Sequence, residues 1–145
     1  MRIYLAGPLF TAAERAFNAQ LKERLERDYG HSVWLPQEHE HPDKTAKSIF
    51  EDDVAGIDGA EVVVANMDGP DPDSGTCWEC GYAFGIGKPY LVFRTDFRVA
   101  DKDGRASFNP MLAASASRPP IDLAFADIET IAKAIDEELS HLKTN

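Results

Sequence analysis

The feature that most constrains the fold of this chain is the run Glu-Val-Val-Val-Ala-Asn at residues 61–66. Its interior is apolar and mostly β-branched, and it lacks the polar alternation of a strand that faces water on one side. Strands of this kind are covered on both faces, as in parallel sheets with helices packed above and below. The run therefore predicts a buried strand of an α/β fold.

Other apolar runs alternate with helical patterns along the chain. We expect further strands at residues 2–6, 32–35, 89–93 and 121–125. We expect helices at residues 11–29, 45–59, 75–86 and 127–142, the first opening on the capping-box sequence Thr-Ala-Ala-Glu. In a chain of 145 residues, this order predicts one doubly wound domain, residues 1–145, with a five-stranded parallel sheet flanked by helices on both faces.

The charge balance narrows the possible partners of the protein. With 15 Lys and Arg against 25 Asp and Glu, the net charge is -10, which repels nucleic-acid phosphates and anionic membrane surfaces. We therefore expect a small, neutral or weakly charged ligand, with no nucleic acid and no membrane as partner. No apolar run approaches the roughly 20 residues that span a bilayer. Met1-Arg2 leads directly into the first strand, so we expect a cytoplasmic protein.

Ligands of doubly wound sheets bind outside the carboxyl ends of the strands. The loop after the Val-rich strand, residues 66–76, carries several acids and leads into a helix that bears Glu79. A helix N-terminus favours an ionised Asp73, whereas a desolvated Glu79 would act as nucleophile or base. The structural alternative is that Asp73 or Ser74 caps the helix and Glu79 is solvated. Residues 95–120 show little periodicity, which is typical of a functional or mobile loop.

Residues 73–83, Asp-Ser-Gly-Thr-Cys-Trp-Glu-Cys-Gly-Tyr-Ala, resemble the signature of the nucleoside 2-deoxyribosyltransferase family. The similarity extends to Ile-Tyr-Leu-Ala-Gly-Pro at residues 3–8, to Asp-Asp-Val-Ala-Gly-Ile at 52–57 and to Asn-Pro-Met at 109–111. Each piece is short, but together they span most of the chain in the family's order. The resemblance implies a flavodoxin-like sheet and transfer of 2-deoxyribose between nucleobases with retention at the anomeric carbon.

The resemblance also implies roles for four residues. Glu79 matches the nucleophile that forms a covalent 2-deoxyribosyl enzyme, and Tyr4 matches the tyrosine that orients its carboxylate. Asp53 and Asp73 match the aspartates that bind the sugar hydroxyls and exchange a proton with the departing base, with the division of these tasks left open. The chemistry agrees, because retention requires two attacks on the anomeric carbon with a carboxylate as the intermediate leaving group.

Six further residues are expected to contact the substrate: Gly7, Pro8, Phe10, Gly75, Asn109 and Met111. For the last two, the structural alternative is an ordinary loop asparagine and a gap-filling methionine. The family implies neither metal nor organic cofactor, deoxynucleosides and nucleobases as partners, and a homo-oligomer, dimer or larger. Residues 141–145 do not match the C-terminal carboxylate that family members often contribute to a neighbouring subunit's sugar site.

Other motifs in the chain indicate no cofactor. Cys77 and Cys80 have the spacing of thioredoxin-like sites, but they lie within the transferase-like signature, so we interpret them as small structural residues of a helix. Zinc binding would need a second ligand pair, and the glycines after residue 80 lack the order of a dinucleotide fingerprint. Three histidines are expected on solvated turns: His31, His39 and His41.

Two other functions compete with base transfer. A 2′-deoxynucleoside 5′-phosphate N-hydrolase of the same superfamily would carry phosphate-binding Ser or Arg residues just after the first strand. Residues 7–11 are mostly apolar there, which favours a free nucleoside, while Arg15 leaves the question open. A non-catalytic nucleotide-binding domain is the second alternative, but such a module would need no nucleophile.

Overall fold

The computed structural model describes residues 1–39, 43–97 and 108–142, and its centre is a parallel sheet in the order β2-β1-β3-β4-β5. The strands are β1 (Arg2–Ala6), β2 (Ser32–Trp34), β3 (Val62–Asn66), β4 (Tyr90–Arg94) and β5 (Ile121–Asp122). All four neighbouring pairs are parallel. The order is that of flavodoxin-like sheets, so the predicted fold class is confirmed.

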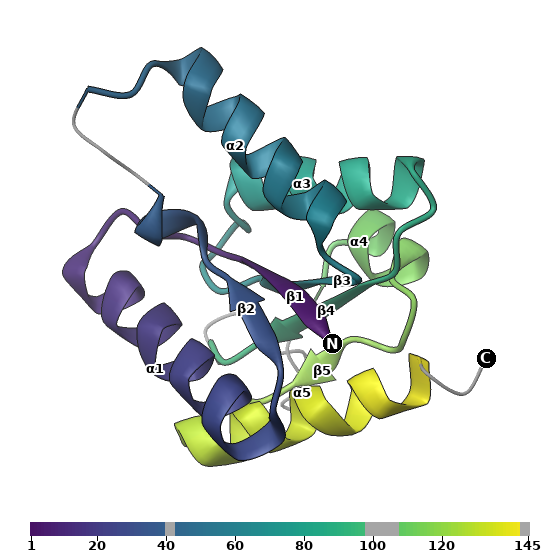
Figure 1. The fold of residues 1–145 in the computed structure, drawn as a ribbon. Helices are drawn as coiled ribbons and strands as arrows, with labels where there is room; N and C mark the ends of the chain where they lie inside the picture. Colours follow the sequence, from purple (N-terminus) through teal and green to yellow (C-terminus); the bar gives the residue numbers. More distant parts are fainter. Residues whose placement is uncertain (40–42, 98–107, 143–145) are drawn as a thin grey trace.

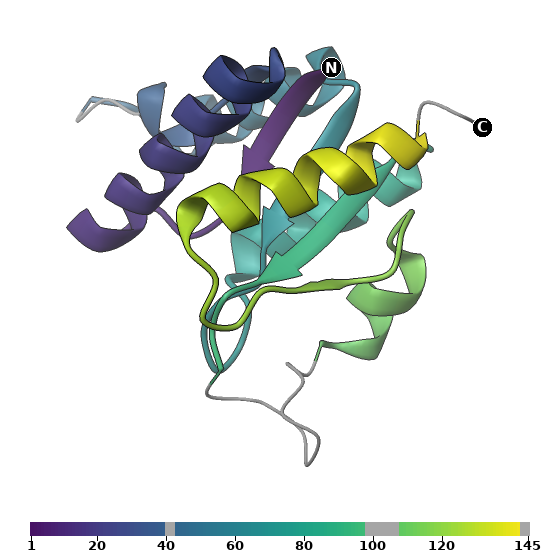
Figure 2. The same cartoon turned by 90° about the horizontal axis from the view of Figure 1, so that it is seen from below.

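Helices cover both faces of the sheet (Figures 1 and 2). On one face lie α1 (Ala12–Tyr29) and α5 (Ile128–Leu142). On the other lie α2 (Ala46–Gly59), α3 (Ser74–Gly85) and α4 (Pro110–Ser115). A 3₁₀ turn, η1 (Pro36–Glu38), follows β2.

The side chains of β3 alternate between two apolar cores. Val62 and Val64 pack with α1 and α5, whereas Val63 and Ala65 pack with α2 and α3. Every residue of β3 is buried. The absence of polar alternation in residues 61–66 therefore has the predicted cause, burial on both faces.

Two elements differ from the prediction. Helix α4 lies in the segment expected to be a loop, and it is only six residues long, with Asn109 as its N-cap and Pro110 in its first turn. So short a helix leaves no apolar periodicity to detect. Strand β5 stops at Asp122, and Phe125, which was expected to end it, has a left-handed φ of 65°.

The prediction for His31 was wrong, because this side chain is buried. Its Nδ1 lies 3.1 Å from the amino group of Met1, and its Nε2 lies 2.9 Å from Asp136 Oδ1 on α5. His39 is exposed, as expected, and stacks on Trp34. His41 lies outside the described residues.

The capping box predicted at the start of α1 is present in full. Glu14 N–H donates to Thr11 Oγ1, and Thr11 N–H donates to the Glu14 carboxylate at 2.7 Å. Two amide groups that the helix leaves unpaired are thereby satisfied.

We expect Thr11→Ala to lower the free energy of unfolding by about 1 kcal/mol, because Glu14 N–H loses the hydroxyl oxygen that accepts its hydrogen bond. Urea denaturation of the variant and the wild type measures the difference. Thr11→Ser is the matched control, since its hydroxyl can replace that of threonine; equal stability of Thr11→Ala and Thr11→Ser would contradict the prediction.

Candidate active site

The carboxylates of Asp53, Asp73 and Glu79 meet in one cavity of about 210 Å³. Asp53 comes from α2, Asp73 precedes α3, and Glu79 lies on the second turn of α3. The cavity also contains three of the predicted substrate contacts: Gly7, Phe10 and Gly75. The structure thus brings together acids that are far apart in the sequence and that the family resemblance had singled out.

Tyr4 joins this cluster from β1. Its hydroxyl donates a hydrogen bond to Glu79 Oε1 at 2.5 Å, and its side chain is fully buried. Burial, together with the negative charges of Glu79 and Asp53, raises the pKa of Tyr4 far above its ordinary value. Tyr4 therefore remains a protonated donor at any physiological pH.

The environment of Glu79 raises its pKa to about 7. Burial is the main cause, and the charges of Asp53 and Asp73 act in the same direction, whereas the hydrogen bond from Tyr4 lowers the pKa. Near neutral pH, Glu79 therefore exists both as a carboxylate able to attack and as an acid able to donate a proton. A titration in this range is characteristic of catalytic carboxyl groups.

Asp73 has a structural role and also faces the cavity. As the N-cap of α3, its Oδ2 accepts hydrogen bonds from Thr76 N–H at 2.8 Å and Thr76 Oγ1 at 3.1 Å. A Cβ on residue 75 would lie 3.1 Å from the same oxygen, so Gly75 leaves room for the carboxylate to fold over the helix end. The capping alternative is confirmed for Asp73, and it places the carboxylate in the cavity.

The loop after β1 forms part of the cavity wall and is held by α1. Arg15 Nη1 donates to the carbonyl oxygens of Leu9 and Phe10 at 3.2 and 3.1 Å, and Asn18 Nδ2 donates to Pro8 O at 3.0 Å. These bonds fix the loop backbone, while the Phe10 side chain stays 69% exposed.

Several lining residues were not predicted, namely Leu9, Pro36, Ile49 and Thr76. Thr76 lies within the quoted signature and Leu9 within the loop singled out after the first strand, so a closer interpretation of these segments could have found them. Pro36 and Ile49 carry no chemical signal in the sequence, because an apolar residue after a strand or on a helix is ordinary.

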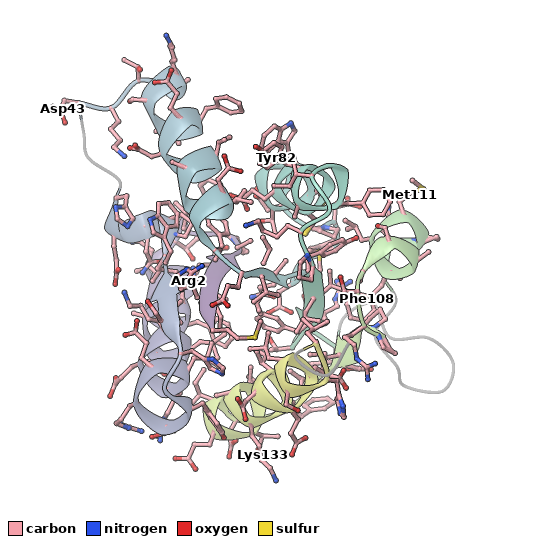
Figure 3. The ribbon with its side chains drawn as sticks, turned by 45° about the vertical axis from the view of Figure 1, so that its right-hand side comes forward. Arg2, Asp43, Tyr82, Phe108, Met111 and Lys133 are labelled. Carbon is pink, nitrogen blue, oxygen red and sulfur yellow. The ribbon has the colours of Figure 1, made fainter. Side chains whose placement is uncertain are left out.

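The structure does not bring Pro8, Asn109 or Met111 to this cavity. Pro8 lines a separate cavity of about 280 Å³. The Asn109 side chain accepts a hydrogen bond from Met111 N–H at 2.9 Å and thereby caps α4. Met111 lies on the outer side of α4 and is 78% exposed (Figure 3).

The two cysteines on α3 are free thiols, with Cys80 buried and Cys77 partly buried. Burial is the largest of the effects that raise the pKa of the Cys77 and Cys80 thiols. Both sulfurs therefore stay protonated and unreactive. Among the described residues, no three His, Cys, Asp or Glu side chains are grouped to hold a metal ion. Within the same residues, no helix has the length and apolar character to cross a membrane.

Comparisons with known proteins show the family and the fold of this chain. The model of the family described as nucleoside 2-deoxyribosyltransferase matches residues 3–132. Among solved structures, a conserved protein from Enterococcus faecalis V583 is 24% identical with a TM-score of 0.77, covering 95% of this chain and 98% of that chain. A 2-deoxyribosyltransferase from Bacillus psychrosaccharolyticus is 26% identical with a TM-score of 0.68, covering 91% and 90%.

A CMP N-glycosidase from Clostridium botulinum shares the fold at 17% identity and a TM-score of 0.63, covering 95% of this chain and 99% of that chain. A search of curated proteins gives no significant match.

We expect Tyr4→Phe to move the pKa of Glu79 above about 7, because the variant loses the hydrogen bond that favours the charged form. Hydrogen bonds to charged groups are worth roughly 1.5–3 kcal/mol, which corresponds to about one to two pKa units. Titration of isotope-labelled glutamate carboxyls by NMR measures the shift, with Glu79→Gln assigning the resonance. Tyr82→Phe is the matched control, since its hydroxyl bonds the exposed Asp58. An unchanged Glu79 titration in Tyr4→Phe would show that the bond does not tune this carboxyl.

Proposed function

Because the chain belongs to the nucleoside 2-deoxyribosyltransferase family, we propose that it moves 2-deoxyribose between nucleobases by double displacement at Glu79. One observation carries the proposal. The Tyr4 hydroxyl lies 2.5 Å from Glu79 Oε1, and this carboxyl shares a cavity with Asp53 and Asp73. A nucleophile, a group that orients it and two further acids are the parts that a retaining glycosyl transfer requires.

In the proposed first step, ionised Glu79 attacks C1′ of the sugar. A carbon–oxygen bond forms while the N-glycosidic bond breaks, and the base leaves with the bonding electron pair and takes up a proton from a neighbouring acid. In the second step, a nitrogen of the acceptor base attacks C1′ and Glu79 departs as a carboxylate, while the acceptor returns a proton to the acid that gave one up in the first step. Two inversions give net retention. Tyr4 holds the carboxylate oxygen throughout and stabilises its charge as it returns.

The positions of Asp53 and Asp73 support a division of their tasks. A proton on the Asp73 oxygen that Thr76 binds would disrupt the cap of α3. We therefore assign the contact with the sugar hydroxyls to Asp73 and the exchange of the proton with the base to Asp53. Asp53 reaches the cavity from α2, on a different element from the nucleophile.

The size and lining of the cavity fit a nucleoside that is only partly enclosed. Its volume of about 210 Å³ is below the roughly 300–1,000 Å³ of pockets that enclose a whole drug-sized ligand. We place the sugar among the three carboxylates and the base against the apolar side of the cavity, formed by Phe10, Pro36 and Ile49. Substrate contacts from Asn109 and Met111 remain predictions, as does a homo-oligomer.

The main alternative is hydrolysis of a 5′-phosphorylated substrate, with water in place of the acceptor base. This alternative is considered because a CMP N-glycosidase shares the fold of this chain. However, the described lining of the cavity contains three carboxylates and neither Lys nor Arg. The amide at the start of α3 that would attract a phosphate already binds Asp73. Arg15 is engaged with loop carbonyl oxygens instead of lining the cavity.

We expect the wild type to form deoxyadenosine from adenine and either 2′-deoxyinosine or thymidine, as followed by chromatography. Glu79→Ala should lower the rate at least about a thousandfold, because it removes the nucleophile. Asp52→Ala is the matched control, since Asp52 is next to Asp53 on α2 but is half-exposed and pairs with Lys44.

Other products would favour the alternative functions. Free base released without a new nucleoside would indicate hydrolysis. Binding of nucleosides without any product would indicate a non-catalytic nucleotide-binding domain.

We expect thymidine to be a better donor than thymidine 5′-monophosphate by at least about tenfold in kcat/KM, because the phosphate would be repelled by the carboxylates. Asp73→Ser removes one of these charges and keeps an N-cap. It should therefore lower the ratio of kcat/KM for thymidine to kcat/KM for the monophosphate, even if both rates fall. Initial rates with the two donors measure the ratio. A preference for the monophosphate would support the phosphate-dependent hydrolase instead.

A further inference from the structure

Tyr4 belongs to a stack of three rings that extends from the active site to the surface. Tyr4 and Trp34 are register partners on β1 and β2, and their side chains lie on the same face of the sheet. The centroids of these two rings are 4.9 Å apart, with 13° between the planes. His39 stacks on Trp34 at 4.3 Å and 4°. Trp34 therefore contacts both the buried phenol ring and an imidazole at the surface.

Helix α2 holds the indole of Trp34 in place. A Cβ on residue 56 would lie 2.8 Å from Cδ2 and Cε2, the two atoms that both rings of the indole share. Carbon atoms pack favourably at about 3.5–4.0 Å, so only a glycine lets the helix approach the ring this closely. Strand β2 has three residues and lies at the edge of the sheet, so no further strand among the described residues covers Trp34 on its outer side. The contact with Gly56 on α2 therefore limits how far the indole can turn outward.

Trp34 also separates Tyr4 from water. A cavity of about 540 Å³ lies beside β2 and α2, and its lining includes Trp34, Gly56 and His39. Tyr4 is fully buried although its stacking partner borders that cavity. Loss of the indole would extend this cavity toward the phenol ring, while the cavity that holds Glu79 does not include Trp34.

We propose that Trp34 is a positioning residue of the reaction, which acts through Tyr4 on Glu79; the proposal rests on the function proposed above. The parallel stack fixes the tilt of the phenol ring, and the tilt decides whether the hydroxyl stays on Glu79 Oε1. Gly56 is part of the same device, because it leaves the space that the indole fills. Trp34 does not contact the substrate, so its loss should change the rate more than the binding.

The first test compares Trp34→Leu with Trp34→Phe in the transfer assay. Trp34→Leu should lower kcat about ten- to a hundredfold, the loss expected from a displacement of about 1 Å, with KM changed by less than about twofold. The acid limb of the pH profile should move to higher pH, because Glu79 loses part of the bond that lowers its pKa. Trp34→Phe keeps a ring against Tyr4 and should restore most of kcat.

The control for this comparison is Phe84→Leu. Phe84 is an aromatic residue near the end of α3, is 61% exposed and lines neither the cavity of Glu79 nor that of Trp34. Its replacement should leave kcat and the pH profile unchanged.

A second test uses the fit between Gly56 and Trp34. Gly56→Ala should displace the indole and reproduce the fall in kcat of Trp34→Leu. Adding Trp34→Phe to Gly56→Ala should raise kcat again, because the smaller ring leaves space for the new methyl group. A general loss of packing would make the double variant worse than Gly56→Ala alone. This comparison also decides the matter if Trp34→Leu does not fold.

The decisive measurement is the NMR titration of the Glu79 carboxyl, which needs no substrate. A raised Glu79 pKa in folded Trp34→Leu supports the proposal. An unchanged pKa in the folded variant overturns it, even if kcat falls. If the wild type neither transfers nor hydrolyses any nucleoside, the proposed function fails. The titration still decides whether Trp34 positions Tyr4 against Glu79.

Discussion

The parallel pairing of β1 with β3 determines where the candidate active site of this protein lies. It aligns Tyr4 with Val63 and brings the loops that follow the two strands to one edge of the sheet. Helix α3 then returns across the face that carries Tyr4 and packs Cys80 against the same core, which leaves Glu79 within reach of the phenol. A slip of one residue would turn Tyr4 to the opposite face. The candidate active site therefore depends on the register of two central strands.

The cluster of acids has a cost in stability that the rest of the fold must offset. Folding raises the pKa of Glu79 from 4.5 to about 7, so the native state holds this proton more tightly than the unfolded chain. The contribution of Glu79 to stability is fully present at pH below about 4.5 and is lost as the pH rises through about 7. Near neutral pH the protein therefore keeps a buried carboxylate that other charges repel. This carboxylate costs stability near neutral pH, and under the proposed function it is the group that attacks the sugar.

Local patterns predicted the elements that burial or capping marks strongly. Residues 61–66 are apolar because both faces of β3 are covered, and Thr11 begins α1 because its hydroxyl satisfies a free amide. Helix α4 escaped prediction, since six residues make fewer than two turns and an Asn-Pro start is equally typical of loops. The environment of His31 also escaped prediction, because its partner Asp136 lies 105 positions away in the sequence.

The sequence by itself determined the α/β sheet, and through its motifs it singled out the three acids of the cluster and the tyrosine that joins them. Only the tertiary structure decided that Tyr4 meets Glu79 across 75 positions, that Asp73 both caps α3 and lines the cavity, and that Met111 lies outside it. The stacking of Trp34 on Tyr4 likewise could not be predicted from any pattern in the sequence. The physical reason is that motifs record residue types along the chain, whereas distance, burial and local charge arise from packing between distant segments.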